Sequence, residues 1–379
     1  MAGKITKKID AEEKPVEVIS EVKKTPKIIN KKTIDISKLK SFKTANGLNE
    51  DVKDKELTWI PISKAFTEAT GLPGIPKGYI TLSRGFSNTG KSTSLMEAIV
   101  SAQKMGILPV IIDTENNFNW EHAKDMGLQF DEVVDETTGE VVNYDGFFIF
   151  INNEYLIENF GKKRDKKRQE AVIEDVAEFC HDLCDKQAEG DLPYELLFAW
   201  DSIGTLDAEI SVTSKNRNNM WNAGALETAF KSLINHRLPA SRKEGKPYTN
   251  TMIAVQKVWL DSMQGRGNIR HKGGEAFYYG ARLILHFGGI LSHGTEKLKA
   301  TSGGKEYSFA ISTKIEVVKN QINGIQLLGK IISTPHGFIS PDNLDVYRKE
   351  NKDYLLSKLG ATSGDIEIIS EIVDSIDGE

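Results

Sequence analysis

Short apolar runs alternate with stretches of helical periodicity along most of this chain. The apolar runs predict strands, and the periodic stretches predict helices. The expected strands are Tyr79–Ser83, Leu108–Asp113, Phe147–Asn152, Leu196–Asp201 and Thr251–Gln256, and the expected helices lie near Thr93–Met105, Trp120–Met126, Glu170–Gln187 and Ala223–Asn235. Strands that alternate with helices favour an α/β fold with a mostly parallel twisted sheet and helices on both faces.

Two regions depart from this alternation. The stretch "VVDETTGEVV", Val133 to Val142, predicts an inserted β-hairpin that turns at Thr138 and Gly139. After Gly280 the helices become sparse, and "RLILHFGG", "YSFAISTKIEVVKN" and "QLLGKIIS" predict antiparallel strands at one edge of the sheet.

Charge is distributed unevenly and suggests the domain boundaries. Residues 1–43 contain twelve Lys and six acidic residues, whereas Gly360 to Glu379 contains six acidic residues and no Lys or Arg. We expect a flexible basic N-terminal arm over residues 1–55, an α/β core over 56–338, and a small C-terminal segment with an acidic tail over 339–379.

Composition narrows the class of protein. The chain has 379 residues, 39% of them hydrophobic, and a net charge of −5. No apolar run approaches membrane-spanning length, and the N-terminus has no apolar signal region, so we expect a cytoplasmic location. The cysteines are Cys180 and Cys184. Their spacing and the absence of a second ligand pair favour buried helix residues over a zinc site.

The stretch "RGFSNTGKST" fits the phosphate-binding pattern G-x-x-x-x-G-K-[ST] at every fixed position. In such a loop the backbone N–H groups surround the phosphates, the Lys ammonium contacts the β/γ oxygens, and the Ser hydroxyl coordinates Mg²⁺. We therefore expect ATP and Mg²⁺ as cofactors. The expected nucleotide-binding residues of the loop are Gly85, Phe86, Ser87, Asn88, Thr89, Gly90, Lys91, Ser92 and Thr93.

Three carboxylates follow apolar strands at positions suited to ATP hydrolysis. Asp113 and Glu115 end the strand after the phosphate-loop helix, and a carboxylate there polarises the attacking water. Asp201 ends the buried strand "ELLFAWD" and, with Ser92, is the expected Mg²⁺ ligand. Taken alone, an Asp at the end of a strand is as typical of a turn or a helix cap as of a catalytic or metal-binding role.

The order of these motifs resembles the RecA family of strand-exchange recombinases from about Trp59 to Phe338. "DTENNFNW" is similar to the family's segment with the catalytic glutamate, here Glu115, "AWDSIGTL" to its Walker B strand, and "KGGEAFYYGARLIL" to the double-glycine segment after its second DNA loop. The short spacing after the double glycine is closer to phage UvsX recombinases than to bacterial RecA. The resemblance implies a RecA-like P-loop ATPase core.

The resemblance also implies roles for residues outside the phosphate loop. Gln256 or Lys257 would couple the γ-phosphate to the DNA loop, and the sequence does not choose between them. His122 occupies the adenine-stacking position, and Lys319 matches a lysine that reaches the neighbouring subunit's nucleotide, whereas Gln321 departs from a second family lysine. The expected catalytic set is therefore Lys91, Glu115, Gln256 and Lys257.

Two DNA loops are expected at Asp207–Asn219 and Lys257–Lys272. Their basic residues suit phosphate neutralisation; they are Lys215, Arg217, Arg266, Arg270 and Lys272. In the arm, Phe42 and Ala45 form an F-x-x-A pattern that resembles the docking motif of eukaryotic and archaeal relatives. A stray aromatic residue in a flexible arm is the alternative. The basic run "GKKRDKKRQE" also suits phosphates, but we favour a solvated start of a helix.

The resemblance implies a DNA-dependent ATPase that forms filaments on single-stranded DNA and pairs it with homologous duplex DNA in recombination and repair. Partners would include single-strand-binding and loader proteins, and a phage-encoded protein would act in the host cytoplasm. Two alternatives stay open at this point. One is a ring-forming replicative helicase on the same core, and the other is a non-catalytic nucleotide-sensing mediator that binds DNA.

Overall fold

A computed structural model of the chain describes residues 53–214, 219–261, 268–271, 275–289, 294–361 and 363–372. The predicted Phe42 and Ala45 docking motif and most of the predicted 1–55 arm lie outside these residues. Residues 53–55 contact the loop before Thr251: Lys55 N donates to Arg242 O, and Lys53 pairs with Glu244.

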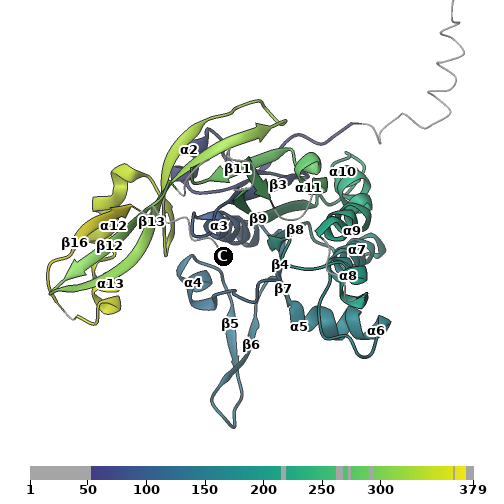
Figure 1. Cartoon of the computed structure of the whole chain (residues 1–379), viewed down its shortest axis with the longest axis horizontal. Helices are drawn as coiled ribbons and strands as arrows, with labels where there is room; N and C mark the ends of the chain where they lie inside the picture. Colours follow the sequence, from purple (N-terminus) through teal and green to yellow (C-terminus); the bar gives the residue numbers. More distant parts are fainter. Residues whose placement is uncertain are drawn as a thin grey trace, which may run out of the picture. The chain divides into compact units, whose positions relative to one another are not determined.

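Six parallel strands form the centre of a large sheet (Figure 1). In spatial order they are β11 (Leu283–Phe287), β3 (Ile80–Gly85), β9 (Thr251–Asp261), β8 (Leu196–Ile203), β4 (Leu108–Asp113) and β7 (Ile149–Asn152). This architecture confirms the predicted α/β class. β4 has the predicted bounds, because its apolar run lies between a glycine turn and a carboxylate.

Antiparallel strands extend the sheet at one edge, as predicted. They are β13 (Lys305–Asn320), β14 (Leu328–Thr334) and β15 (Gly337–Ile339). In addition, β12 (Glu296–Ser302) pairs with β13, and β16 (Glu367–Ile372) pairs with β12. One expectation was wrong: β11, within "RLILHFGG", pairs parallel to β3 and antiparallel only to β13. The direction of a strand depends on its neighbours and is not encoded in its own apolar pattern.

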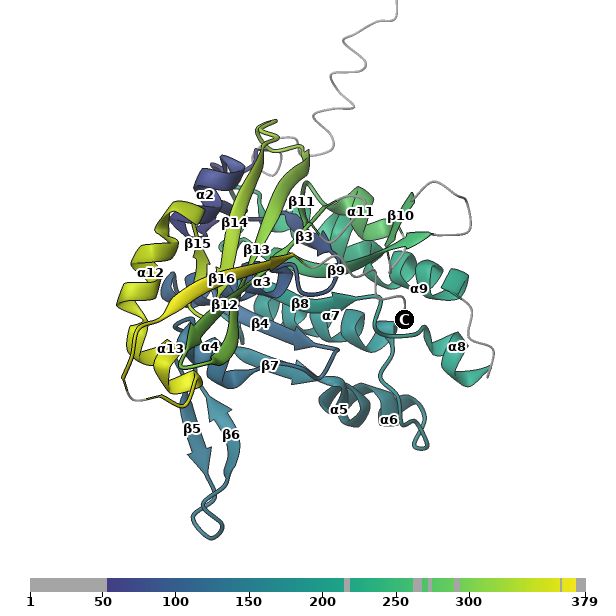
Figure 2. The same ribbon diagram turned by 60° about the vertical axis from the view of Figure 1, so that its left-hand side comes forward.

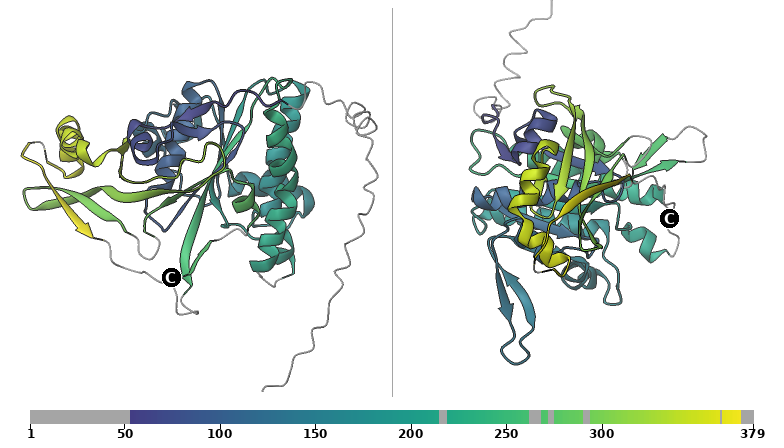
Figure 3. Two further views of the ribbon diagram at one scale, coloured as in Figure 1. Left: turned by 90° about the horizontal axis from the view of Figure 1, so that it is seen from above. Right: turned by 90° about the vertical axis from the view of Figure 1, so that its left-hand side faces the viewer.

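Apolar side chains on both faces of the sheet are covered by helices. In β8, Leu196, Phe198 and Trp200 join one core cluster, whereas Leu197 and Ala199 join the other. The two layers of helices lie on opposite sides of the sheet in Figure 3. The first layer has α7 (Ile173–Glu189), α9 (Asn219–Ser232), η2 (Leu233–Arg237), α10 (Leu238–Ser241) and α11 (Ala276–Gly280), and the second has α2 (Lys64–Thr70), α3 (Lys91–Lys104) and α4 (Trp120–Asp125).

Two antiparallel pairs lie outside the large sheet. β1 (Trp59–Pro61) pairs with β2 (Gly74–Pro76). β5 (Asp131–Val134) and β6 (Val141–Asp145) form the predicted hairpin, which turns through Gly139 at a φ of 73° and projects from the core (Figure 2). Tyr144 at its base stacks on Trp120, with a distance of 4.0 Å between ring centroids.

A third core cluster lies near the C-terminus. It packs η4 (Pro341–Asn343), α12 (Leu344–Glu350) and α13 (Lys352–Lys358) near β12, β13 and β14, with Tyr347, Leu355 and Phe309 among its buried residues. These residues come from both sides of the predicted division at residue 338, so the division stays a prediction.

The basic run departs from the expected solvated helix start. It follows α5 (Asn153–Leu156) and η1 (Ile157–Gly161), and α6 (Lys162–Arg164) covers only its first residues. Arg168 is buried, with 6% of its surface exposed. The helix that follows, α7, begins at Ile173, where the Asp175 carboxylate accepts a hydrogen bond from Val172 N.

Cys180 and Cys184 are both buried and free on α7, as predicted. Within the described ranges no group of three or more His, Cys, Asp or Glu side chains is arranged to hold a metal ion. No helix in the same ranges combines the length and the apolar character that crossing a membrane requires.

Candidate nucleotide site

The candidate site lies at the carboxyl edge of the parallel strands. Gly85 of β3 is paired with Lys257 of β9, and Asp113 of β4 is paired with Asp201 of β8. Parallel strands end at the same edge of a sheet, which is where open α/β sheets bind their ligands. Sequence segments more than 100 residues apart thus meet around the phosphate loop.

The phosphate loop connects β3 to α3 through a strained backbone. Asn88 and Gly90 have φ values of 55° and 94°, in the left-handed region. A Cβ on Gly85 would lie 2.2 Å from the carbonyl oxygen of Phe287, so only glycine fits there. The N-terminal N–H groups of the 14-residue helix α3 then face the loop, which favours an anion.

Lys91 lies folded back across this loop. Its ammonium donates to the carbonyl of Phe86, and only 5% of the residue is exposed. Burial lowers the pKa of Lys91 to about 8, although the nearby Asp201 favours the charged form. A buried cation in a cradle of this kind fits a phosphate group.

Ser92 and Asp201 form the candidate Mg²⁺ site. Ser92 Oγ donates to Asp201 Oδ2 at 2.9 Å. Burial raises the pKa of Asp201 to about 6, and the nearby Glu115 carboxylate adds to this shift. The peptide bond between Asp201 and Ser202 is cis. Hydroxyl and carboxylate oxygens are the donors that Mg²⁺ prefers, so the residues present fit this ion.

Glu115 lies beside this pair, and three side chains donate to its carboxylate, one of them Asn117 Nδ2, which lies 3.2 Å from Oε2. Ser202 Oγ donates to Glu115 Oε1, and Lys257 Nζ lies 2.8 Å from Glu115 Oε2. Burial alone raises the pKa of Glu115, but the hydrogen bonds from Lys257 and Ser202 outweigh it, so the pKa is lowered overall. The neighbouring Asp113 has a different role, since its carboxylate accepts from Glu115 N and Phe118 N and fixes the turn.

The two predicted sensor residues differ in their surroundings. Gln256 is fully buried within β9, between β3 and β8. Lys257 reaches Glu115 and keeps 42% of its side chain exposed. Of the two, Lys257 is the one that contacts the predicted catalytic carboxylate.

His122 lies on α4, close to a turn that the sequence analysis did not connect with the site. Burial lowers the pKa of His122, and its surroundings include Pro335 and His336 of the turn between β14 and β15. Ser333, just before that turn, lies 2.6 Å from Thr93 Oγ1. No local motif in "IISTPHGF" indicates this contact with the phosphate-loop helix.

Lys319 lies away from the phosphate loop of its own chain. It is paired with Ile284 near the start of β11, whereas Gly85 is paired with Phe287 at the other end. Its ammonium donates to the carbonyls of Tyr278 and Tyr279, and Gln321 accepts from Arg282 at 2.6 Å. The structure therefore does not bring Lys319 together with Lys91 in one chain.

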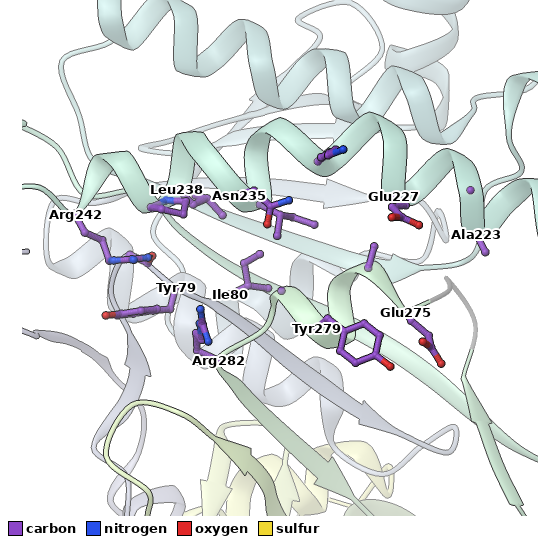
Figure 4. A pocket seen from close by; sticks show the side chains of 17 residues that line it. Tyr79, Ile80, Ala223, Glu227, Asn235, Leu238, Arg242, Glu275, Tyr279 and Arg282 are labelled. Atoms are coloured by element: carbon purple, nitrogen blue, oxygen red, sulfur yellow. The ribbon is translucent and has the colours of Figure 1, made fainter. Parts of the chain in front are cut away.

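A cavity of about 800 Å³ lies near the starts of β3 and β11, at the ends of these strands opposite the phosphate loop (Figure 4). Its lining includes Glu227, Tyr279 and Arg242, whose guanidinium stacks over the Tyr79 ring at 4.2 Å. None of its lining residues belongs to the phosphate loop, so we place the nucleotide at Lys91 and not in this cavity.

The predicted DNA-binding residues lie mostly outside the described residues. Lys215, Arg217, Arg266 and Lys272 are among them, and Arg270 is described only as a backbone position of β10 (Asn268–His271). The expected second DNA loop is not irregular throughout, because β9 continues to Asp261 and pairs antiparallel with β10. The first loop contains α8 (Glu209–Thr213).

Comparisons with known proteins point to one family. Residues 32–141, which include the phosphate loop and Glu115, match the RecA N-terminal domain. The chain is 37% identical to protein RecA of Aquifex pyrophilus over 83 residues, or 22% of this chain and 24% of that protein. It is 38% identical to protein RecA of Lactococcus lactis subsp. cremoris over 72 residues, which is 19% of each chain. The chain thus spans about a quarter or less of the length of these relatives. Together with the sheet around the phosphate loop, these matches confirm the predicted resemblance to the RecA family.

Proposed function

We propose that this protein is an ATP-dependent DNA recombinase. It would assemble as a filament on single-stranded DNA and promote pairing and strand exchange with homologous duplex DNA. The observation that carries the proposal is the group formed by Lys91, Ser92, Glu115, Asp201 and Lys257, because it joins a phosphate loop to the strand that leads into the predicted second DNA loop.

ATP with Mg²⁺ would supply the phosphoanhydride bond that is cleaved. Gly85 to Thr93 would hold the phosphates, and Ser92 and Asp201 would hold the ion. Glu115 would orient the attacking water and accept its proton at a carboxylate oxygen. His122 would contact the base.

Lys257 is the residue that we propose as the link between nucleotide and DNA. Its ion pair keeps the pKa of Glu115 low, and a carboxylate with a low pKa is a weak base. A γ-phosphate would compete with Glu115 for this ammonium. Movement of Lys257 away from Glu115 would then strengthen the base and shift β9, which carries the predicted DNA loop. Gln256, buried in the same strand, would move with it.

Self-association is the remaining part of the proposal. β7 is an edge strand of the described sheet, and unpaired strand edges favour pairing with another chain. Phe42 and Ala45 of one subunit would dock on the next, and Lys319 would reach that neighbour's nucleotide. Single-strand-binding and loader proteins, and a relationship to UvsX, stay predictions.

Electron microscopy with single-stranded DNA and a slowly hydrolysed ATP analogue tests this function. We expect helical filaments with the wild-type chain and none with Lys91→Ala. A strand-exchange assay with circular single strands and linear duplex should give joint molecules only with the wild type. Closed rings would favour the helicase alternative, and DNA binding without ATP hydrolysis or filaments would favour the mediator.

A further inference from the structure

The basic segment Lys162–Arg168 comes after the end of β7 at the carboxyl edge of the sheet, which is the edge where the candidate site lies. It follows β7 through α5, and Asn153 at the start of α5 donates to the carbonyl of Thr114, next to Glu115. Its α6 lies near α8 of the predicted first DNA loop in Figures 1 and 2. The proposed function gives this segment no role.

Its two arginines are held by carboxylates. Arg168 lies 3.4 Å from Asp175 and 3.3 Å from Glu209, and only 4% of its side chain is exposed. Arg164 reaches the same two carboxylates at 3.3 and 3.5 Å and also pairs with Glu178. Buried charges persist only when they are paired, so Arg168 anchors the segment and is not available to a ligand. Arg164 is more exposed, but three carboxylates hold its guanidinium.

The lysines differ from the arginines in exposure. Lys162 pairs with Glu158, and Lys163 lies over the Phe160 ring. Lys166 and Lys167 are exposed in a turn that Asp165 closes by accepting from Lys167 N, and no ion pair holds either lysine among the residues described. Lys163 of α6 and Lys166 and Lys167 of the turn are thus exposed beside the anchored arginines.

The anchored arginines are also connected to the predicted first DNA loop. Glu209 is the first residue of α8, and its N–H donates to Glu174 at 3.0 Å. Ile173 N donates to Asp207 O, and Val172 bridges to Asp207. The ion pairs of Arg164 and Arg168 with Glu209 therefore join the lysine-bearing turn directly to the base of the loop.

We propose that Lys163, Lys166 and Lys167 bind the phosphate backbone of DNA held at the first loop, with Arg164 and Arg168 as the residues that position them. The inference rests on the DNA binding proposed above. Its chemistry is phosphate neutralisation, which single-stranded and duplex DNA share.

A charge-removal series in the full-length protein tests the site. The variant Lys163→Gln, Lys166→Gln, Lys167→Gln is compared with Lys104→Gln, Lys186→Gln, Lys246→Gln, which removes three exposed lysines from other elements. Each neutralised phosphate contributes about 0.7 to the slope of log affinity against log salt for single strands and about 0.9 for duplex DNA. We expect the first variant to lower the slope by about 2 if single-stranded DNA occupies the site and by about 2.7 if duplex DNA does, and the second variant to leave it unchanged.

Cross-linking identifies the DNA. The native Cys180 and Cys184 are buried, and burial raises the pKa of both thiols, so a photoreactive maleimide should label Lys166→Cys selectively. Labelled Lys166→Cys should cross-link to the first strand or to a duplex added later, and labelled Lys186→Cys to neither. If the first variant keeps the wild-type slope of log affinity against log salt with both kinds of DNA, this inference is wrong and the proposed function is unaffected. Failure of the wild type to bind DNA with ATP would overturn the proposed function as well.

Discussion

At the scale of single residues, the Glu115 carboxylate accepts from neutral Ser202 on one oxygen and from neutral Asn117 and cationic Lys257 on the other. Ser202 orients the group, and Lys257 also sets its charge. Substitution of Lys257 can therefore separate the effect of charge from that of the neutral hydrogen bonds.

Glu115→Gln should retain ATP and DNA binding while hydrolysis falls about 100-fold or more, because an amide cannot accept the proton of water. Steady-state phosphate release and binding of a fluorescent ATP analogue measure the two effects. Glu121→Gln, an exposed change of the same kind, is the control. Turnover at the wild-type rate would remove Glu115 from the mechanism.

Lys257→Met should uncouple hydrolysis from DNA. Loss of the ammonium lets burial raise the pKa of Glu115, so hydrolysis without DNA should persist within a few-fold, while stimulation by DNA should disappear. ATPase assays with and without DNA measure both, with the exposed Lys124→Met as control. Undiminished stimulation would transfer the coupling role to Gln256.

Asp201 should make the protein without nucleotide and metal less stable as the pH rises. Its pKa is about 6 in the folded chain and 3.8 ordinarily, so the folded state keeps a proton that the unfolded chain has lost. Stability from this proton is complete below about pH 4 and is lost as the pH passes 6. We therefore expect the free energy of unfolding of Asp201→Asn, relative to that of the wild type, to increase by about 1–3 kcal/mol from pH 4 to pH 7. Urea unfolding in EDTA measures this difference. An equal difference at both pH values would contradict this origin.

At the scale of elements, the sequence analysis succeeded where local pattern determines structure. The apolar run before Asp113, the glycines of the phosphate loop and the turn at Gly139 each specify their own conformation. It failed where the structure of a segment depends on residues that are distant in the sequence. The parallel direction of β11 depends on β3, the burial of Arg168 depends on Asp175 and Glu209, and the contact of Ser333 with Thr93 depends on the return of β14 to α3.

The same distinction applies to the candidate site. The spacing of motifs predicted that Lys91, Ser92, Glu115 and Asp201 lie close together, because each follows a parallel strand. The contact between Lys257 and Glu115 was not predictable, since it depends on side-chain reach across neighbouring strands.

The β5–β6 hairpin should be stable mainly through its base. Replacing residues 135–140 by Asn-Gly removes only residues that lie beyond the packed base, so the free energy of unfolding should change by less than about 0.5 kcal/mol. Tyr144→Ala removes the stacking on Trp120 and the edge contact with Phe130, and should cost about 1–3 kcal/mol. Urea titration distinguishes the two, and a larger loss from the tip replacement would contradict this picture.

At the scale of the whole molecule, Lys91 and Lys319 lie at opposite edges of the sheet. If each complete site combines Lys91 of one subunit with Lys319 of the next, Lys91→Ala and Lys319→Ala should each be inactive alone. An equal mixture should recover about a quarter of wild-type hydrolysis, because one interface in four joins two intact residues. The assay is ATP hydrolysis on single-stranded DNA. A mixture as inactive as its components would place the whole site within one chain.

The position of β3 between β9 and β11 has a consequence for synthesis of the chain. Both neighbours of this strand come from residues 251–287, and α3 gains its contacts with Ser333 and Phe338 later still. While the chain emerges from the ribosome, the phosphate-loop segment must wait for about 250 further residues before its partners exist. A nascent chain that ends before β14 should therefore be a substrate for chaperones and should not retain nucleotide.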